Sequence, residues 1–132
     1  MKLVVPEPGS GAAATLWRAA GRLISAPLVY PEARAAIGRA RRAGRLPGTR
    51  ARRARSLLDR LLEEVDWAPL TRDVLWRAGG LADTEGLRAY DAVHLAAFEL
   101  SGRLGAVLIT ADRELAEAAR RLGYAVAVPD GP

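Results

Sequence analysis

The sequence contains no cysteine, and it has one histidine, His94, and one lysine, Lys2. The absence of cysteine excludes disulfide bonds, thiolate zinc sites, iron–sulfur clusters and cysteine nucleophiles. A single histidine also excludes a histidine-rich metal site and any mechanism that needs two imidazoles. Carboxylate, hydroxyl and guanidinium groups are therefore the polar side chains that remain for chemistry.

Long hydrophobic runs are missing as well. No uninterrupted apolar stretch approaches the 18 residues or so of a membrane-spanning helix, and the apolar start of the chain stops at Pro6, too soon for a secretory signal. The chain has 132 residues, half of them hydrophobic, which suits one folded domain with a real core. We therefore expect a single cytoplasmic domain over residues 1–132.

Positive charge is concentrated in one segment. The whole chain carries a formal charge of +5, but residues 34–60 hold ten arginines and one acid, Asp59, so the remainder sums to −4. Such a segment beside an acidic remainder is typical of a protein with a polyanionic partner such as nucleic acid. A solvated arginine-rich helical face explains the charge equally well, and arginine-rich composition also arises from GC-rich coding sequence.

Predicted helices and strands alternate along the chain. Hydrophobic periodicity and turn residues predict helices over 12–22, 28–44, 50–65, 71–85, 89–102 and 113–122. Short apolar runs predict strands over 23–27, 105–110 and 124–128, and residues 66–70 are expected to form a short strand or a connector. This alternation predicts parallel βαβ units in an α/β fold. Trp17, Trp67 and Trp76 are expected to anchor the core.

Asp112 lies where open parallel sheets usually place their sites. It directly follows the predicted strand over 105–110 and precedes the predicted helix over 113–122. Thr110, two residues earlier, is expected to face the same way. Aspartate is also a preferred N-cap, so Asp112 is expected to cap the helix as well, and the two roles are compatible.

Two more acids occupy similar places. Asp91 lies in the first turn of the apolar helix predicted over 89–102, and Glu32 lies one turn into the helix predicted over 28–44. Three acids from separated segments suit a divalent cation such as Mg²⁺, which takes oxygen ligands and acts on phosphodiesters. Favourable interaction with helix dipoles is an alternative reason for acids in these positions. His94, one turn after Asp91, is expected to be a core residue.

Three stretches resemble one known family. They are ISAPLVYPEARAAIGRARRAGRL, which contains Glu32; GLRAYDAVHLAAFEL, which contains Asp91; and VLITADRELAEAARRLGYAV, which contains Thr110 and Asp112. Their order and spacing resemble the PIN-domain family, and in particular the VapC-type toxins of bacterial toxin–antitoxin pairs.

The resemblance implies a fold and an activity. The fold is a three-layer α/β/α sandwich with a central parallel sheet, and the activity is Mg²⁺- or Mn²⁺-dependent RNA cleavage. Glu32, Asp91 and Asp112 would be the catalytic metal ligands, with Thr110 in support. A cognate antitoxin would cover the acidic cleft, and homodimers are common. Seven arginines are expected to guide the RNA backbone: Arg39, Arg41, Arg42, Arg45, Arg50, Arg52 and Arg53.

The beginning of the chain departs from the family pattern. The family opens with a strand that ends in an aspartate, whereas Met1–Ser10 resembles the end of the first helix and the loop after it. One explanation is a start assigned too late. Another is that residues 2–5 occupy the strand position, with Glu7 replacing the aspartate. The third is a degenerate domain that binds RNA or an antitoxin without cleavage. Outside the family, a generic doubly wound domain with an arginine-rich face is the alternative.

Overall fold

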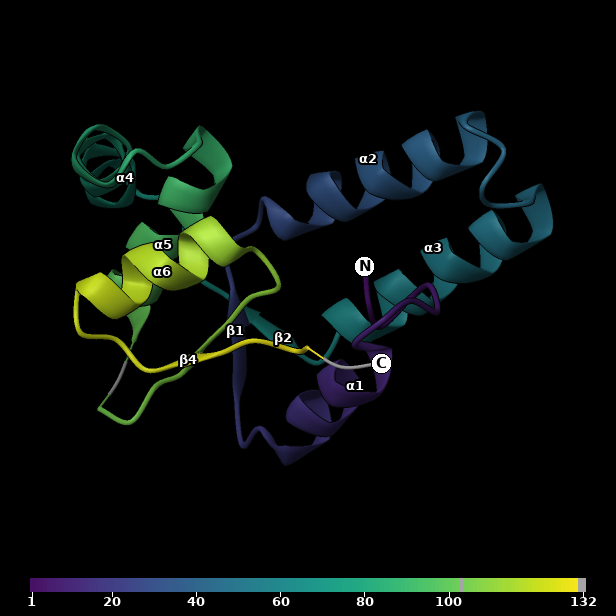
Figure 1. Ribbon diagram of the computed structural model, residues 1–132, viewed down its shortest axis with the longest axis horizontal. Coiled ribbons are helices and arrows are strands. Elements are labelled where there is room, and N and C mark those ends of the chain that lie inside the picture. Colours follow the sequence, from purple (N-terminus) through teal and green to yellow (C-terminus); the bar gives the residue numbers. More distant parts are fainter. Residues whose placement is uncertain (103, 131–132) are drawn as a thin grey trace. The chain divides into compact units, whose positions relative to one another are not determined.

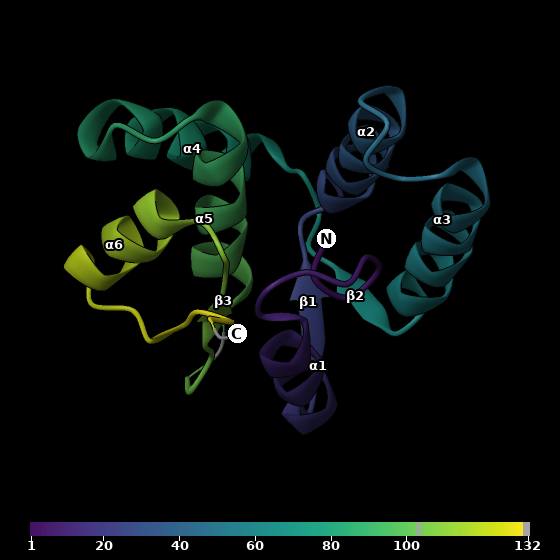
Figure 2. The same ribbon diagram turned by 45° about the vertical axis from the view of Figure 1, so that its right-hand side comes forward.

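The computed structural model describes residues 1–102 and 104–130, which divide into two compact units. The first unit consists of residues 1–23 and 28–66, and the second of residues 24–27 and 67–130. Their helices and strands are labelled in Figures 1 and 2. No helix in these described ranges combines the length and the apolarity needed to cross a membrane.

A helical hairpin forms most of the first unit. It consists of α2, Val29–Arg42, and α3, Gly48–Leu62, and it follows the shorter helix α1, Ser10–Ala19. The two long helices pack through one apolar stripe each, as their 3.6-residue spacing predicts. Their buried core contains Ile37, Leu46, Ala51, Ala54 and Leu58.

The first residues of the chain form a turn. The backbone N–H groups of Val4 and Val5 both donate to the carbonyl of Met1, at 2.9 and 3.0 Å. The two valines pack against the hairpin core. The hypothesis that residues 2–5 form a replacement strand is therefore wrong. The N–H groups of Val4 and Val5 form hydrogen bonds within the turn and do not pair with a neighbouring strand.

Two short strands connect the units. Strand β1, Leu23–Ser25, and strand β2, Val65–Trp67, form a two-stranded sheet. Just beyond β2, the Ala68 N–H donates to the Ser25 carbonyl at 2.9 Å. The boundary between the two units runs through both strands.

Three helices dominate the second unit. Helix α4, Arg72–Glu85, packs on α5, Ala89–Ser101, and α5 also packs on α6, Arg113–Arg121. Figure 2 shows the three from a second direction. Helix α4 ends at Gly86, whose φ of 67° is the left-handed conformation that favours glycine. This tight end turns the chain directly into α5.

The second unit also contains a two-stranded sheet. Strands β3, Leu108–Ile109, and β4, Val126–Ala127, are parallel, with Leu108 opposite Val126. Helix α6 is the crossover between them, and its buried face presents Leu115 and three alanines to the unit's interior. This β3–α6–β4 segment is the βαβ unit that the sequence predicts.

The observed elements confirm the predicted α/β class. Each predicted helix and strand has a counterpart, although the strands are shorter and form two separate pairs among the described residues. The expectation that all three tryptophans anchor the core is wrong. Trp67 is 46% exposed and Trp76 is 70% exposed. The guanidinium of Arg72 lies over the Trp76 ring, 4.7 Å from its centre, and interacts with its π face in solvent.

An ion pair joins α4 to α5 in the second unit. The Arg77 guanidinium donates from Nε and Nη2 to both carboxylate oxygens of Glu99, at 2.5 and 2.9 Å. This hydrogen bonding, with a smaller contribution from Tyr124, lowers the pKa of Glu99, whose side chain is only 8% exposed. A lowered carboxyl pKa gives stability that is present above the unfolded-state pKa and is lost as the pH falls through the folded-state pKa.

We expect Glu99→Gln to lower the free energy of unfolding at pH 7 by about 1–3 kcal/mol, because it leaves the Arg77 fork without its carboxylate. Urea unfolding monitored by circular dichroism measures the difference in free energy of unfolding between the wild type and the variant. This difference should shrink as the pH falls below about 4.5. Glu117→Gln, at an exposed position of α6, is the control and should change stability by less than about 0.5 kcal/mol. An equal loss from Glu99→Gln at pH 3 and pH 7 would contradict the pairing.

Candidate metal centre

Asp112 is held rigidly at the start of α6. It is the N-cap of the helix, and its Oδ1 accepts a hydrogen bond from the Leu115 N–H at 2.9 Å. This bond satisfies one of the free N–H groups of the first turn, which explains why the helix begins here. The second oxygen, Oδ2, is not used by the cap and accepts a hydrogen bond from Arg88 instead. Asp112 therefore caps the helix, as the sequence predicts, and its role as a metal ligand stays a prediction.

Thr110 fixes the loop that carries Asp112. Its Oγ1 accepts a hydrogen bond from the Asp112 N–H at 3.1 Å, and its own N–H donates to the Ala127 carbonyl of β4 at 3.2 Å. The threonine therefore ties the aspartate backbone to the β3–β4 pair. The role of Thr110 in the reaction stays a prediction, and the structure shows its contact with the Asp112 backbone.

Asp91 is a buried charged residue. It is 8% exposed and lies in the first turn of α5, directly before the buried residues Ala92 and Val93. A buried carboxylate needs a partner, since an unpaired charge in a low-dielectric environment is strongly unfavourable. The first turn of a helix favours a negative charge but does not by itself neutralise it.

Arg88 supplies that partner, and sequence reasoning did not single it out. Its Nε donates to Asp91 Oδ2 at 3.0 Å, and its Nη2 donates to Asp112 Oδ2 at 2.7 Å. One guanidinium therefore bridges the two carboxylates that the sequence predicts as metal ligands. The signal available was a basic residue three positions before Asp91, at the N-cap of α5.

The bridge brings two negative groups to one cation. Hydrogen bonding to Asp91, and then the charges of Asp91 and Asp112, raise the pKa of Arg88 above its already high value, so the guanidinium stays charged. Two carboxylates that converge on a single positive group are the donor set that a hard divalent ion takes, with water and substrate oxygens as further ligands. The residues therefore fit a Mg²⁺ or Mn²⁺ ion.

The third predicted ligand, Glu32, belongs to the first unit. It lies in the first turn of α2, and its N–H donates to the Leu28 carbonyl at 3.1 Å. Asp91 and Asp112 belong to the second unit. Across the described part of the chain, no three carboxylate or imidazole side chains form a cluster that could hold a metal. The three-acid ligand set stays a prediction, of which the structure brings two members together.

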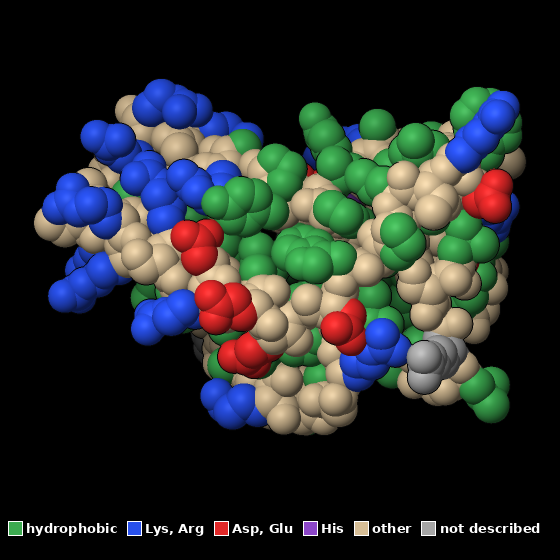
Figure 3. All heavy atoms as spheres, turned by 180° about the vertical axis from the view of Figure 1, so that it is seen from behind, with side chains coloured by type: hydrophobic (Ala, Val, Ile, Leu, Met, Phe, Trp, Pro, Cys, Tyr) green, Lys and Arg blue, Asp and Glu red, His purple; other side chains and the backbone are tan. Residues whose placement is uncertain are grey.

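The predicted RNA-contacting arginines all belong to the α2–α3 hairpin. Figure 3 shows the blue side chains gathered over the α2–α3 hairpin. All seven are exposed: Arg39, Arg41, Arg42, Arg45, Arg50, Arg52 and Arg53. We call these seven residues the hairpin arginines. Their exposure leaves the guanidinium groups accessible to a polyanion, while the apolar stripes of both helices pack inward.

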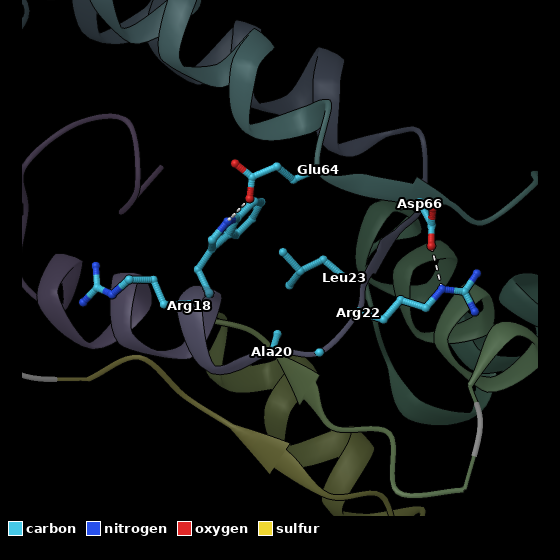
Figure 4. Close-up of a pocket in the computed structure, with 8 residues that line it drawn as sticks. Arg18, Ala20, Arg22, Leu23, Glu64 and Asp66 are labelled. Carbon is cyan, nitrogen blue, oxygen red and sulfur yellow. Dashed lines mark hydrogen bonds and ion pairs between the residues drawn. The ribbon is translucent and has the colours of Figure 1, made fainter.

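The first unit also contains an open pocket of about 440 Å³. Its lining includes Trp17, Arg22, Glu64 and Asp66 (Figure 4). The Trp17 indole N–H donates to Glu64 at 3.0 Å, and Arg22 pairs with Asp66 at 2.5 Å. None of the predicted site residues lines this pocket.

Most of the chain matches one protein family. The family model described as PIN domain matches residues 1–121, and the chain belongs to that family. Two curated relatives from Mycobacterium tuberculosis are each 35% identical over 127 residues, which cover 96% of this chain and 88% of the relative. They are Ribonuclease VapC45 of strain CDC 1551 / Oshkosh and Ribonuclease VapC49 of strain ATCC 25618 / H37Rv. The family predicted from the three sequence stretches is confirmed.

Proposed function

We propose that this chain is a Mg²⁺- or Mn²⁺-dependent endoribonuclease, the VapC-type toxin of a toxin–antitoxin pair. The observation that carries the proposal is the convergence of Asp91 and Asp112 on one cationic group in a PIN domain. The similarity to two proteins named as VapC ribonucleases supports RNA as the substrate.

Each residue of the site has a distinct task in this proposal. Asp91 and Asp112 would hold the ion, and Glu32 would complete the ligand set. Thr110 would keep Asp112 in place through the hydrogen bond to its N–H. When bound, the ion supplies Lewis acidity for the attack of water on a phosphodiester and for the charge on the leaving oxygen.

The hairpin arginines would bind the RNA backbone. Guanidinium groups pair with phosphate oxygens, and the release of condensed counterions makes such binding depend on salt. The acidic remainder of the chain gives the cleavage site the opposite charge. We thus assign attraction of RNA and cleavage of RNA to different groups of residues.

A toxin of this class requires a neutralising partner. We propose that a cognate antitoxin covers the carboxylates, that the protein acts as a homodimer, and that it meets its RNA in the cytoplasm. The chemistry of Asp91 and Asp112 indicates that an antitoxin would present a cationic side chain to them, since a guanidinium already satisfies both.

The test is cleavage of a circular RNA by the full chain in Mn²⁺. An endoribonuclease should open the circle to a linear molecule, because it needs no free end. Retention of the circle together with a stable protein–RNA complex would contradict the proposal. That result would favour the alternative of a truncated or degenerate PIN domain that binds RNA without cleaving it.

A further inference from the structure

Arg88 occupies the same carboxylate oxygens that a metal ion would need. It contacts Asp91 Oδ2 at 3.0 Å and Asp112 Oδ2 at 2.7 Å, while Asp112 Oδ1 is engaged by the N–H of Leu115. The oxygen of Asp112 that is not used as a helix cap is therefore already paired with a cation. A divalent ion on that oxygen would lie beside the guanidinium, and the two positive charges would repel each other.

The Arg88 side chain is free to leave. It is 67% exposed, in contrast to the 12% exposed side chain of Asp91. Arg88 is the N-cap residue of α5, but its side chain makes no capping hydrogen bond. Its release would therefore not cost the helix a cap. A buried acceptor beside an exposed donor is an arrangement in which the cation can be exchanged.

We propose that Arg88 is an internal counter-cation, which holds Asp91 and Asp112 together in the metal-free protein and leaves them when a divalent ion binds. This inference rests on the proposed function, in which the two aspartates are metal ligands. The inference adds that the Arg88 guanidinium competes with the metal ion for the carboxylates of Asp91 and Asp112. The affinity for metal then depends on how much more strongly the two carboxylates bind the metal ion than they bind the Arg88 guanidinium.

The first test is Mn²⁺ binding, measured from the electron paramagnetic resonance signal of free Mn²⁺ with the full chain and no RNA. We expect Arg88→Gln to bind Mn²⁺ about tenfold more tightly than the wild type, because the competing charge is removed. Arg121→Gln is the matched control, since Arg121 is also exposed and also pairs with a carboxylate, that of Glu85. Its affinity should equal that of the wild type.

A second measurement follows Arg88 itself. In ¹H–¹⁵N spectra of the wild type, titration with Mg²⁺ should shift the Arg88 Nε–Hε signal toward the position of a solvent-exposed arginine. The midpoint should coincide with the shift of the Asp91 backbone amide. Arg88→Lys keeps the charge but lacks the fork that reaches both aspartates, so its Mn²⁺ affinity should rise by a few-fold. This variant also carries the test if Arg88→Gln folds poorly.

The outcomes separate this inference from the proposed function. Unchanged or weaker Mn²⁺ binding by both Arg88 variants, or an Arg88 signal that Mg²⁺ does not move, would overturn the counter-cation role. Asp91→Asn and Asp112→Asn should each weaken Mn²⁺ binding. If neither does, the ligand assignment fails, and the proposed metal site fails with it.

Discussion

Asp91→Asn should reduce RNA cleavage by about 100-fold or more while the protein stays folded. The amide keeps the size of the carboxylate but carries no charge, so it is a poor ligand for a hard divalent ion. Loss of charge stabilisation worth a few kcal/mol at the reacting phosphate corresponds to two or more powers of ten in rate. The measurement is the initial rate of cleavage of a defined RNA in saturating Mn²⁺, with circular dichroism to verify the fold.

Two further variants sharpen this result. Asp112→Asn should be similarly inactive, and asparagine is as good an N-cap as aspartate, so α6 should remain intact. Asp83→Asn, at an exposed position of α4 in the same unit, should cleave at the wild-type rate. Wild-type cleavage by Asp91→Asn would contradict the assignment of the site.

Removing three of the hairpin arginines should weaken RNA binding by about 100-fold at low salt. In the triple variant, Arg42, Arg52 and Arg53 are replaced by glutamine, which is also a good helix former. If each arginine neutralises one phosphate, the slope of log K against log salt should fall by about 2. Filter binding of a catalytically inactive form, Asp91→Asn, measures affinity without loss of the RNA.

The control removes the same charge elsewhere. Arg18, Arg72 and Arg120 are exposed arginines outside the hairpin arginines, and their replacement by glutamine lowers the net charge by the same 3. Their loss should reduce affinity much less and should leave the salt slope nearly unchanged. Equal losses in the two triple variants would show that net charge, and not the hairpin surface, determines binding.

The order of helices and strands could be predicted from the sequence because local rules decide it. The Asp112 cap, the alternation of apolar runs, and the glycine at the end of α4 are all visible within a few residues. The length of the strands was not predictable in the same way. The apolar run over 105–110 yields only Leu108–Ile109 as strand, since a strand is defined by its register with a neighbour, and the register with β4 covers only those two residues.

The candidate site was predicted in part. Asp91, Asp112 and Thr110 could be found because each lies at a helix start or just after a strand. The bridge by Arg88 could not, because it joins residues 24 positions apart through a side chain whose direction depends on the packing of α5 and α6. The exposure of Trp76 was missed for a similar reason. The glycines at 79 and 80 interrupt the apolar periodicity of this helix, so the sequence does not show which face Trp76 occupies.

Cleavage of RNA as a function of added metal tests the central claim most directly. Wild-type protein freed of metal by a chelator should leave the RNA intact, and titration with Mg²⁺ or Mn²⁺ should restore cleavage. The concentration for half-maximal cleavage should fall in Arg88→Gln, and Asp112→Asn should stay inactive throughout the titration. Full cleavage in excess chelator, at the rate seen with Mn²⁺, would contradict a metal-dependent ribonuclease built on Asp91 and Asp112.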